Sequence, residues 1–194
     1  MNEVLTIPAE LATRIRVVVL DADGVLTNGG IYVADGEGSP FEARKFHVRD
    51  GVGLMMLQRA GLEVAIVSGK VSAAVRARAE DLGVAEIHQV SPYDKLPIVE
   101  SVIHRAGADW EQTAYMGDDL ADLPVLRTVA LPATVPGAAT EVADAAAWVS
   151  SVAGGEGAVR EFAEALLTAR GEWDDLVEAY VAECFKRWDP VPGG

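Results

Sequence analysis

Cysteine and basic residues are both scarce in this chain. One cysteine, Cys184, stands among 194 residues, which excludes an internal disulfide and any cysteine-rich metal site. Lys and Arg number 16 against 30 Asp and Glu, giving a net charge of −14, and no stretch of the sequence gathers the basic residues into a patch. Because nucleic acids and anionic membranes both attract basic surfaces, we expect neither as a partner.

Long apolar stretches are missing as well. No run approaches the ~18 residues of a membrane-spanning helix, and residues 1–12 lack the basic region and apolar core of a signal peptide. We therefore expect a soluble, cytoplasmic protein. Hydrophobic residues still make up 50% of the chain, enough to bury one core. The length predicts a single domain over residues 1–194, with a core at about 14–170 and a C-terminal helix and tail at about 171–194.

Short β-branched runs alternate with helical patterns along the chain. This alternation predicts an α/β fold, a Rossmann-like parallel sheet flanked by helices. Residues 30–48 break the rhythm and read as an inserted β-hairpin between the first strand and the first helix. The predicted strands lie at 15–20, 63–67 and 113–116 and near 129–131 and 147–149; the predicted helices lie at 52–60, 71–82 and 96–106 and at about 158–169 and 172–185.

Polar side chains follow three of the predicted strands at the point where each strand ends. Asp21 and Asp23 follow the first strand, Ser68 the second, and Asp118 and Asp119 the third. The carboxyl ends of parallel strands meet at one edge of the sheet, where ligands bind. Carboxylates gathered there repel one another unless a cation lies among them, and all-oxygen ligands suit Mg²⁺. Any one of these acids taken alone favours a turn or helix-cap role; together they favour a site.

Asp21 and Asp23 are spaced for acid–base and nucleophilic work, two residues apart across a turn that Gly24 permits. One carboxylate can attack phosphorus and form an aspartyl-phosphate, while the other protonates the leaving oxygen and later activates water. Ser68, with N–H groups at the following helix start, can bind phosphate oxygens. Lys95 can supply positive charge to a transferring phosphoryl group, although taken alone it favours a solvated surface lysine.

Four motifs in this order resemble those of the haloacid dehalogenase superfamily: Asp21–Thr27, Ser68, Lys95, and Gly117–Asp119 with Asp122. Within it, residues 14–170 are similar to the 3-deoxy-manno-octulosonate 8-phosphate phosphatase group, which also includes phosphatases of nonulosonate 9-phosphates. A catalytically reduced relative is the second domain of vertebrate sialic-acid activating enzymes. The features shared with the group are Asp23–Thr27, Phe46–Gly53, Gly117–Leu120 and Gly154–Glu161.

The resemblance implies a phosphoric monoester hydrolase that requires Mg²⁺ and acts on a sugar phosphate or sugar-acid phosphate. A non-catalytic oligomerisation domain and a phosphotransferase are the alternatives. The resemblance also assigns roles to single residues. It implies that Asp21 is the nucleophile and a metal ligand, that Asp23 is the general acid/base and a metal ligand through its backbone carbonyl, and that Asp118 is the third metal ligand. It further implies that Asp119 and Asp122 orient the metal site or Lys95, and that the phosphate-binding residues are Ser68, Gly69 and Lys95.

The spacing of the motifs leaves no room for a cap domain, since only 26 residues separate Ser68 from Lys95. In the resembling group, hairpins assemble a tetramer whose neighbouring subunits close each site. We therefore expect a homotetramer built through the hairpin at residues 30–48. The alternative is a hairpin that forms an exposed flap on a monomer.

Two residues depart from the group's pattern. Glu156 and Lys70 stand where the group usually has arginine. Arginine forms bidentate contacts with a carboxylate that lysine does not reproduce, and a nearby glutamate repels one. We therefore expect a substrate with a neutral or amino-bearing far end and poor turnover of octulosonate 8-phosphate; the alternative is that Glu156 is a helix-start acid outside the pocket. Lys70 is a candidate for substrate binding. Arg49 is a further candidate for substrate binding, or else pairs with Asp50 or Asp35 at the end of the hairpin.

Overall fold

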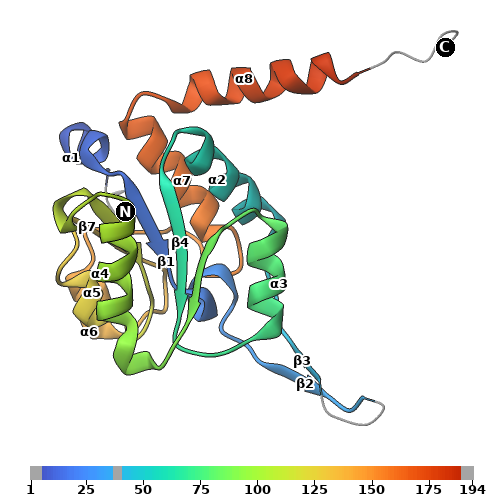
Figure 1. Ribbon diagram of the computed structural model, residues 1–194, viewed down its shortest axis with the longest axis vertical. Coiled ribbons are helices and arrows are strands. Elements are labelled where there is room, and N and C mark those ends of the chain that lie inside the picture. The colour runs from blue at the N-terminus through green and yellow to red at the C-terminus, as the bar shows by residue number, and fades with distance from the viewer. Residues whose placement is uncertain (1–5, 37–40, 189–194) are drawn as a thin grey trace, which may run out of the picture.

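A computed structural model describes residues 6–36 and 41–188 (Figure 1). Its main sheet has six parallel strands in the order β5-β4-β1-β6-β7-β8. The predicted α/β, Rossmann-like fold is therefore confirmed. The strands are β1 (Val17–Leu20), β4 (Glu63–Ser68), β5 (Glu86–Gln89), β6 (Thr113–Met116), β7 (Leu131–Thr134) and β8 (Trp148–Val149).

Strand β1 lies at the centre of the sheet, and its four residues are all buried. Because side chains alternate along a strand, β1 serves two cores. Val18 and Leu20 join the apolar cluster on one face, whereas Val17 and Val19 join the cluster on the other. This double burial explains why the strand reads as a continuous apolar run rather than an alternating one.

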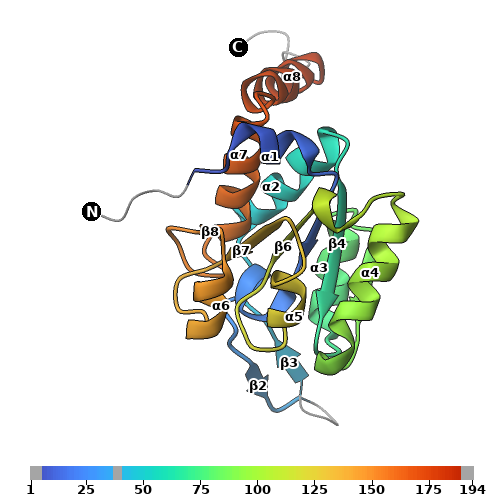
Figure 2. The ribbon, with the colours of Figure 1, turned by 90° about the vertical axis from the view of Figure 1, so that its left-hand side faces the viewer.

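Helices cover both faces of the sheet (Figure 2). Residues of α1, α2, α3 and α7 enter the first cluster, and residues of α4, α5 and α6 enter the second. Among the described residues, no helix combines the length and the apolar character needed to cross a membrane. The bounds are α1 (Ala9–Arg14), α2 (Val48–Arg59), α3 (Ala73–Asp81), α4 (Lys95–Arg105), α5 (Leu123–Leu126), α6 (Thr140–Ala145) and α7 (Ala158–Ala169).

The hairpin and the last helix lie at opposite ends of the molecule (Figures 1 and 2). Strands β2 (Tyr32–Ala34) and β3 (Phe41–Ala43) pair antiparallel, and a bridge between Thr27 and Phe46 continues the pairing toward the sheet. The hairpin is shorter than predicted, because Val48 already belongs to α2; residues 37–40 lie outside the described part. Helix α8 (Trp173–Lys186) contains no buried residue.

The segment between Ser68 and Lys95 contains α3, β5 and a short 3-10 turn, Pro92–Asp94. These elements form the ordinary connection from β4 to α4. The segment between Asp23 and Ser68 holds the hairpin, α2 and β4. Within the described residues there is accordingly no cap domain, and the carboxyl edge of the sheet stays open.

Candidate active site

The carboxyl ends of β1, β4 and β6 meet around a pocket of about 270 Å³. Asp21 follows β1, Ser68 ends β4, and Asp118 comes just after β6. All four predicted motifs therefore line one pocket, as the topology requires. Its lining residues are Asp21, Asp23, Gly29, Ser68, Gly69, Pro92, Lys95, Asp118, Asp119, Ala121 and Asp122.

The loop that carries Asp21 and Asp23 depends on Gly24. Its φ of +91° lies in the left-handed region that glycine adopts without strain. A Cβ at this position would also lie 2.0 Å from Oδ2 of Asp118, so the absent side chain lets the first and last motifs approach. Buried Thr27 fixes the loop, since its Oγ1 accepts the N–H groups of Gly24 at 3.3 Å and Gly29 at 3.2 Å.

Lys95 is a buried cation, only 3% exposed at the first turn of α4. Its Nζ lies 2.9 Å from Oδ1 of Asp21 and 2.6 Å from Oδ1 of Asp122. Burial alone would lower the pKa of Lys95, but the two carboxylates outweigh burial and raise it. Lys95 therefore stays charged inside the pocket, and the interpretation as a solvated surface lysine is wrong.

Asp122 is fully buried and organises the turn after β6. Its Oδ1 accepts hydrogen bonds from Lys95 and, at 2.5 Å, from the hydroxyl of Tyr115. Its Oδ2 accepts the backbone N–H groups of Asp118 at 3.1 Å and Asp119 at 3.2 Å. Both oxygens are thus engaged, which suits the orienting role predicted for Asp122. Sequence reasoning missed Tyr115, because a tyrosine inside a buried strand looks like an ordinary core residue.

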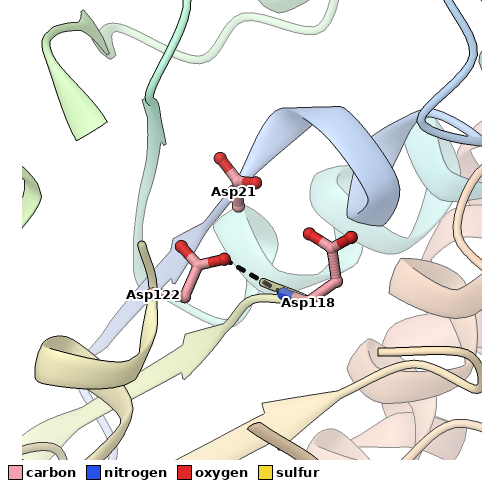
Figure 3. A group of neighbouring side chains, drawn as sticks. All are labelled: Asp21, Asp118 and Asp122. Atoms are coloured by element: carbon pink, nitrogen blue, oxygen red, sulfur yellow. Dashed lines mark hydrogen bonds between the residues drawn. The ribbon is translucent and has the colours of Figure 1, made fainter. Parts of the chain in front are cut away.

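Asp21, Asp118 and Asp122 each place a carboxylate oxygen within 4.8 Å of the others (Figure 3). Burial, and then the Asp122 charge, raise the pKa of Asp21 to about 7. Burial, followed by Asp122 and Asp119, likewise raises the pKa of Asp118 to about 7. Oδ1 of Asp118 is buried and has no hydrogen-bond partner in the described part of the chain. Such crowded, unsatisfied oxygens fit a hard divalent cation.

The remaining pocket residues lie around this cluster. Ser68 is 1% exposed, and its hydroxyl contacts the backbone carbonyl of Lys70 at 3.1 Å and the Lys70 N–H at 3.3 Å. Gly69 borders the pocket closely, since a Cβ there would lie 3.4 Å from Cε of Lys95. The exposed carboxylate of Asp119 accepts the N–H of Leu120 at 2.8 Å. All three predicted positions therefore reach the pocket.

Asp23 has a partner that sequence reasoning missed. Nε of Arg44 lies 2.8 Å from Oδ1 of Asp23. Arg44 follows β3, and its side chain is 0% exposed. The sequence signal was weak, because one arginine in a hairpin pattern usually points to solvent.

Two predicted substrate contacts do not line the pocket. Nζ of Lys70 lies 3.2 Å from Oε2 of Glu42 on β3. Arg49 is exposed in the first turn of α2 and forms no ion pair with Asp50 or Asp35 among the described residues, so that alternative is wrong. Asp50 instead accepts the N–H of Arg160 in the first turn of α7, at 2.9 Å.

Glu156 lies beside the site rather than away from it. It lines a hollow of about 210 Å³ that also touches Gly24 and Asp118, and its carboxylate pairs with Lys45. The preceding glycines hold this segment against the catalytic loop, the loop that carries Asp21 and Asp23. A Cβ at Gly154 would lie 1.7 Å from the backbone oxygen of Gly24, and the N–H of Gly155 bonds the Val25 carbonyl at 3.1 Å.

Comparison with curated proteins finds close relatives, although no family model matches the chain. The 3-deoxy-D-manno-octulosonate 8-phosphate phosphatase KdsC of Salmonella typhi is 38% identical over 165 residues, covering 84% of this chain and 85% of the relative. KdsC of Haemophilus influenzae is 39% identical over 160 residues, covering 82% and 86%.

Solved structures give the same result. The 3-deoxy-D-manno-octulosonate 8-phosphate phosphatase of Moraxella catarrhalis, in complex with magnesium ion, phosphate ion and KDO, matches with a TM-score of 0.83 and 33% identity over 89% of this chain and 97% of its own. The cobalt-bound enzyme of Haemophilus influenzae matches with a TM-score of 0.80 and 35% identity, over 88% and 99%.

Proposed function

The chain belongs to the 3-deoxy-D-manno-octulosonate 8-phosphate phosphatase family of the haloacid dehalogenase superfamily, whose members are phosphoric monoester hydrolases, and from this premise we propose how it works. It hydrolyses a sugar phosphate or sugar-acid phosphate with Mg²⁺ as cofactor, through an aspartyl-phosphate at Asp21. The observation that carries the proposal is the single pocket that joins Asp21, Ser68, Lys95 and Asp118.

The carboxylates of Asp21 and Asp118 and the backbone carbonyl of Asp23 would hold Mg²⁺. The unpartnered Oδ1 of Asp118 supports this assignment, as does the magnesium ion in the Moraxella catarrhalis relative. Asp122 is a poor ligand, because Lys95, Tyr115 and two N–H groups already use its oxygens. When bound, the ion supplies positive charge that screens the carboxylates from the phosphate oxygens.

The reaction proceeds in two displacements at phosphorus. A carboxylate oxygen of Asp21 forms a bond to phosphorus while the bond to the sugar oxygen breaks, and Asp23 gives that oxygen its proton. Asp23, now ionised, takes a proton from water. The water oxygen then bonds to phosphorus, the Asp21–phosphorus bond breaks, and inorganic phosphate leaves with Asp21 regenerated.

Lys95 and Ser68 hold the phosphoryl group during both steps. The Lys95 ammonium balances the charge that the phosphoryl oxygens bring into a buried site, and its ion pair with Asp21 aims the nucleophile. The Ser68 hydroxyl and the backbone beside Gly69 offer hydrogen bonds to phosphate oxygens from the end of β4.

The far end of the substrate is proposed to be neutral or amino-bearing. Glu156 places a carboxylate beside the pocket, and Lys70, already paired with Glu42, offers no bidentate contact. Lys45 neutralises part of the Glu156 charge, so the discrimination against a sugar acid is modest. The names of the relatives, by contrast, specify a sugar-acid phosphate as their substrate.

We also propose a homotetramer joined through the hairpin. Ile31, Val33 and Phe41 are exposed there, at 50%, 68% and 57%, and the open pocket needs a cover that excludes water. Light scattering should give four times the chain mass; a monomer mass together with full activity would contradict this. The cytoplasm stays the predicted location.

Release of inorganic phosphate from a panel of phosphorylated sugars and sugar acids, with Mg²⁺ and no added acceptor, tests the function. Asp21→Asn should lower turnover by roughly 10³-fold or more, because the covalent route disappears, while the fold stays intact. Retention of more than a small fraction of activity by folded Asp21→Asn would refute the nucleophile. Product formation only when an acceptor is added would identify a phosphotransferase instead, and inactivity throughout would favour a non-catalytic domain.

A further inference from the structure

Arg44 is a buried cation that takes no direct part in the two displacements at phosphorus. Its side chain is 0% exposed although the hairpin beside it projects into solvent. Nε contacts Asp23 at 2.8 Å, and Nη2 lies 2.9 Å from Oε1 of Glu42. Removing a guanidinium from water is costly unless its partners are charged and well placed. Asp23 and Glu42 balance its charge and hold it in place, although Nε is the one side-chain nitrogen of Arg44 that makes a hydrogen bond among the described residues.

The partners of Arg44 connect three separate segments of the chain. Asp23 lies in the loop after β1, whereas Glu42 belongs to β3. Oε2 of Glu42 also contacts Lys70, in the loop after β4. The bridge between Thr27 and Phe46 holds the base of the hairpin against the catalytic loop. Arg44 is therefore anchored to the body of the protein on both sides.

The contact with Arg44 distinguishes the two oxygens of Asp23. Oδ1 accepts from Nε of Arg44 and lies 3.5 Å from the Thr27 hydroxyl. Among the described residues, Oδ2 makes no hydrogen bond. A guanidinium always carries its protons and only donates. A proton on Asp23 therefore belongs on Oδ2.

We infer that Arg44 is a positioning residue, which fixes Asp23 so that its Oδ2 delivers the proton to the leaving oxygen. This inference rests on the proposed function, because it needs Asp23 to be the general acid. It also gives the hairpin a second role, since the segment proposed to join subunits holds the acid of its own active site.

The leaving group separates a positioning role from a merely structural one. An alkyl alkoxide needs a proton as the phosphorus–oxygen bond breaks, whereas p-nitrophenolate leaves readily without one. We would compare kcat/KM, which reports the steps up to alcohol release, for 3-deoxy-D-manno-octulosonate 8-phosphate and p-nitrophenyl phosphate. Arg44→Met should lower the value by roughly 10²-fold for the sugar-acid phosphate and by less than about threefold for the aryl phosphate.

Three further variants complete the test. Arg44→Lys should recover part of the loss on the sugar-acid phosphate, since it keeps the charge but cannot contact Asp23 and Glu42 in the same way. Arg59→Met, which removes an arginine paired with Glu183 on α8, should leave both substrates unchanged. Asp23→Asn is the reference and should show the same dependence on the leaving group, more strongly.

Equal losses on both substrates for Arg44→Met and Arg44→Lys would overturn the positioning role, as would no loss on either. If Arg44→Met does not fold, Arg44→Lys decides, because a selective loss on the sugar-acid phosphate supports the inference and equal values contradict it. A folded Asp23→Asn that shows no preference between leaving groups would instead refute Asp23 as the acid, and with it that part of the proposed function.

Discussion

From the buried carboxyl groups of the site we predict that the free energy of unfolding of the metal-free protein falls as the pH rises. Asp21 and Asp118 have pKa values raised to about 7 in the folded chain, mainly by burial, against about 3.9 when unfolded. Between these values the folded chain holds protons that the unfolded chain has released. The free energy of unfolding therefore falls as pH increases from about 4 to about 7, and it levels off above that range.

The size of the effect follows from the same two groups. A rise in pKa from 3.8 to about 7 makes ionisation of one such carboxyl in the folded chain cost at most about 4 kcal/mol, at about 1.4 kcal/mol per pH unit. Asp118 is partly solvated, and both groups owe part of their shift to Asp122, so the costs overlap. We expect a total loss of about 3–5 kcal/mol. Mg²⁺ should abolish most of it, because the cation offsets the crowded charges.

Urea denaturation at about pH 5 and about pH 7.5, with chelator and with Mg²⁺, measures this directly. Asp118→Asn should flatten the pH dependence of the metal-free protein. Asp144→Asn removes the same charge from an exposed position on α6 and should leave the dependence intact, which separates the site from the general effect of the −14 net charge. A free energy of unfolding that stays level or rises between these pH values in chelator would refute the reasoning.

Three other predictions concern the metal, the substrate and the packing. Activity should disappear with chelator and in Asp118→Ala, and Ca²⁺ should inhibit, since its looser coordination misplaces Asp21; full activity of metal-stripped enzyme in a phosphate-release assay would disprove the site. Glu156→Arg should raise kcat/KM for the sugar-acid phosphate relative to a neutral sugar phosphate by about tenfold, and an unchanged ratio would place Glu156 outside recognition. Asp50→Ala should lower the free energy of unfolding by about 1–2 kcal/mol, because the Arg160 N–H in the first turn of α7 loses its acceptor; Asp50→Asn, which keeps an acceptor, should lose less in the same denaturation experiment.

The parts of the fold that sequence reasoning found are those in which burial and periodicity agree. The doubly buried strand at 17–20 gives a continuous apolar run, and α7, whose bounds match the predicted 158–169, has a clear apolar stripe. Helix α1 was missed, because six residues give too short a pattern. The strand predicted near 129–131 lies at 131–134 and includes Pro132, a residue that weakens any strand signal.

The residues of the site likewise fall into those that the sequence predicts and those that it does not. Acids placed directly after strands are found from the sequence, since the topology of a parallel sheet brings them together. Contacts made to these acids by other parts of the chain are not found from the sequence, because they depend on how distant segments pack. Tyr115 reaches Asp122 from inside a strand, and Arg44 reaches Asp23 from a hairpin 21 positions later.

Gly154 and Gly155, which pack against the catalytic loop, have a consequence for when the active site forms during protein synthesis. Gly155 supports a loop whose nucleophile, Asp21, is 134 positions earlier in the sequence. At the usual pace of about 5–20 residues per second, a ribosome needs roughly 7–27 s to cover that distance. For most of this interval Asp118 and Asp122 are not yet synthesised, and once they are, the nascent chain carries all three crowded carboxylates without the backbone that later braces the loop of Asp21. We therefore expect phosphatase activity to arise after synthesis of the last third of the chain, and C-terminal truncations before Gly154 to be inactive.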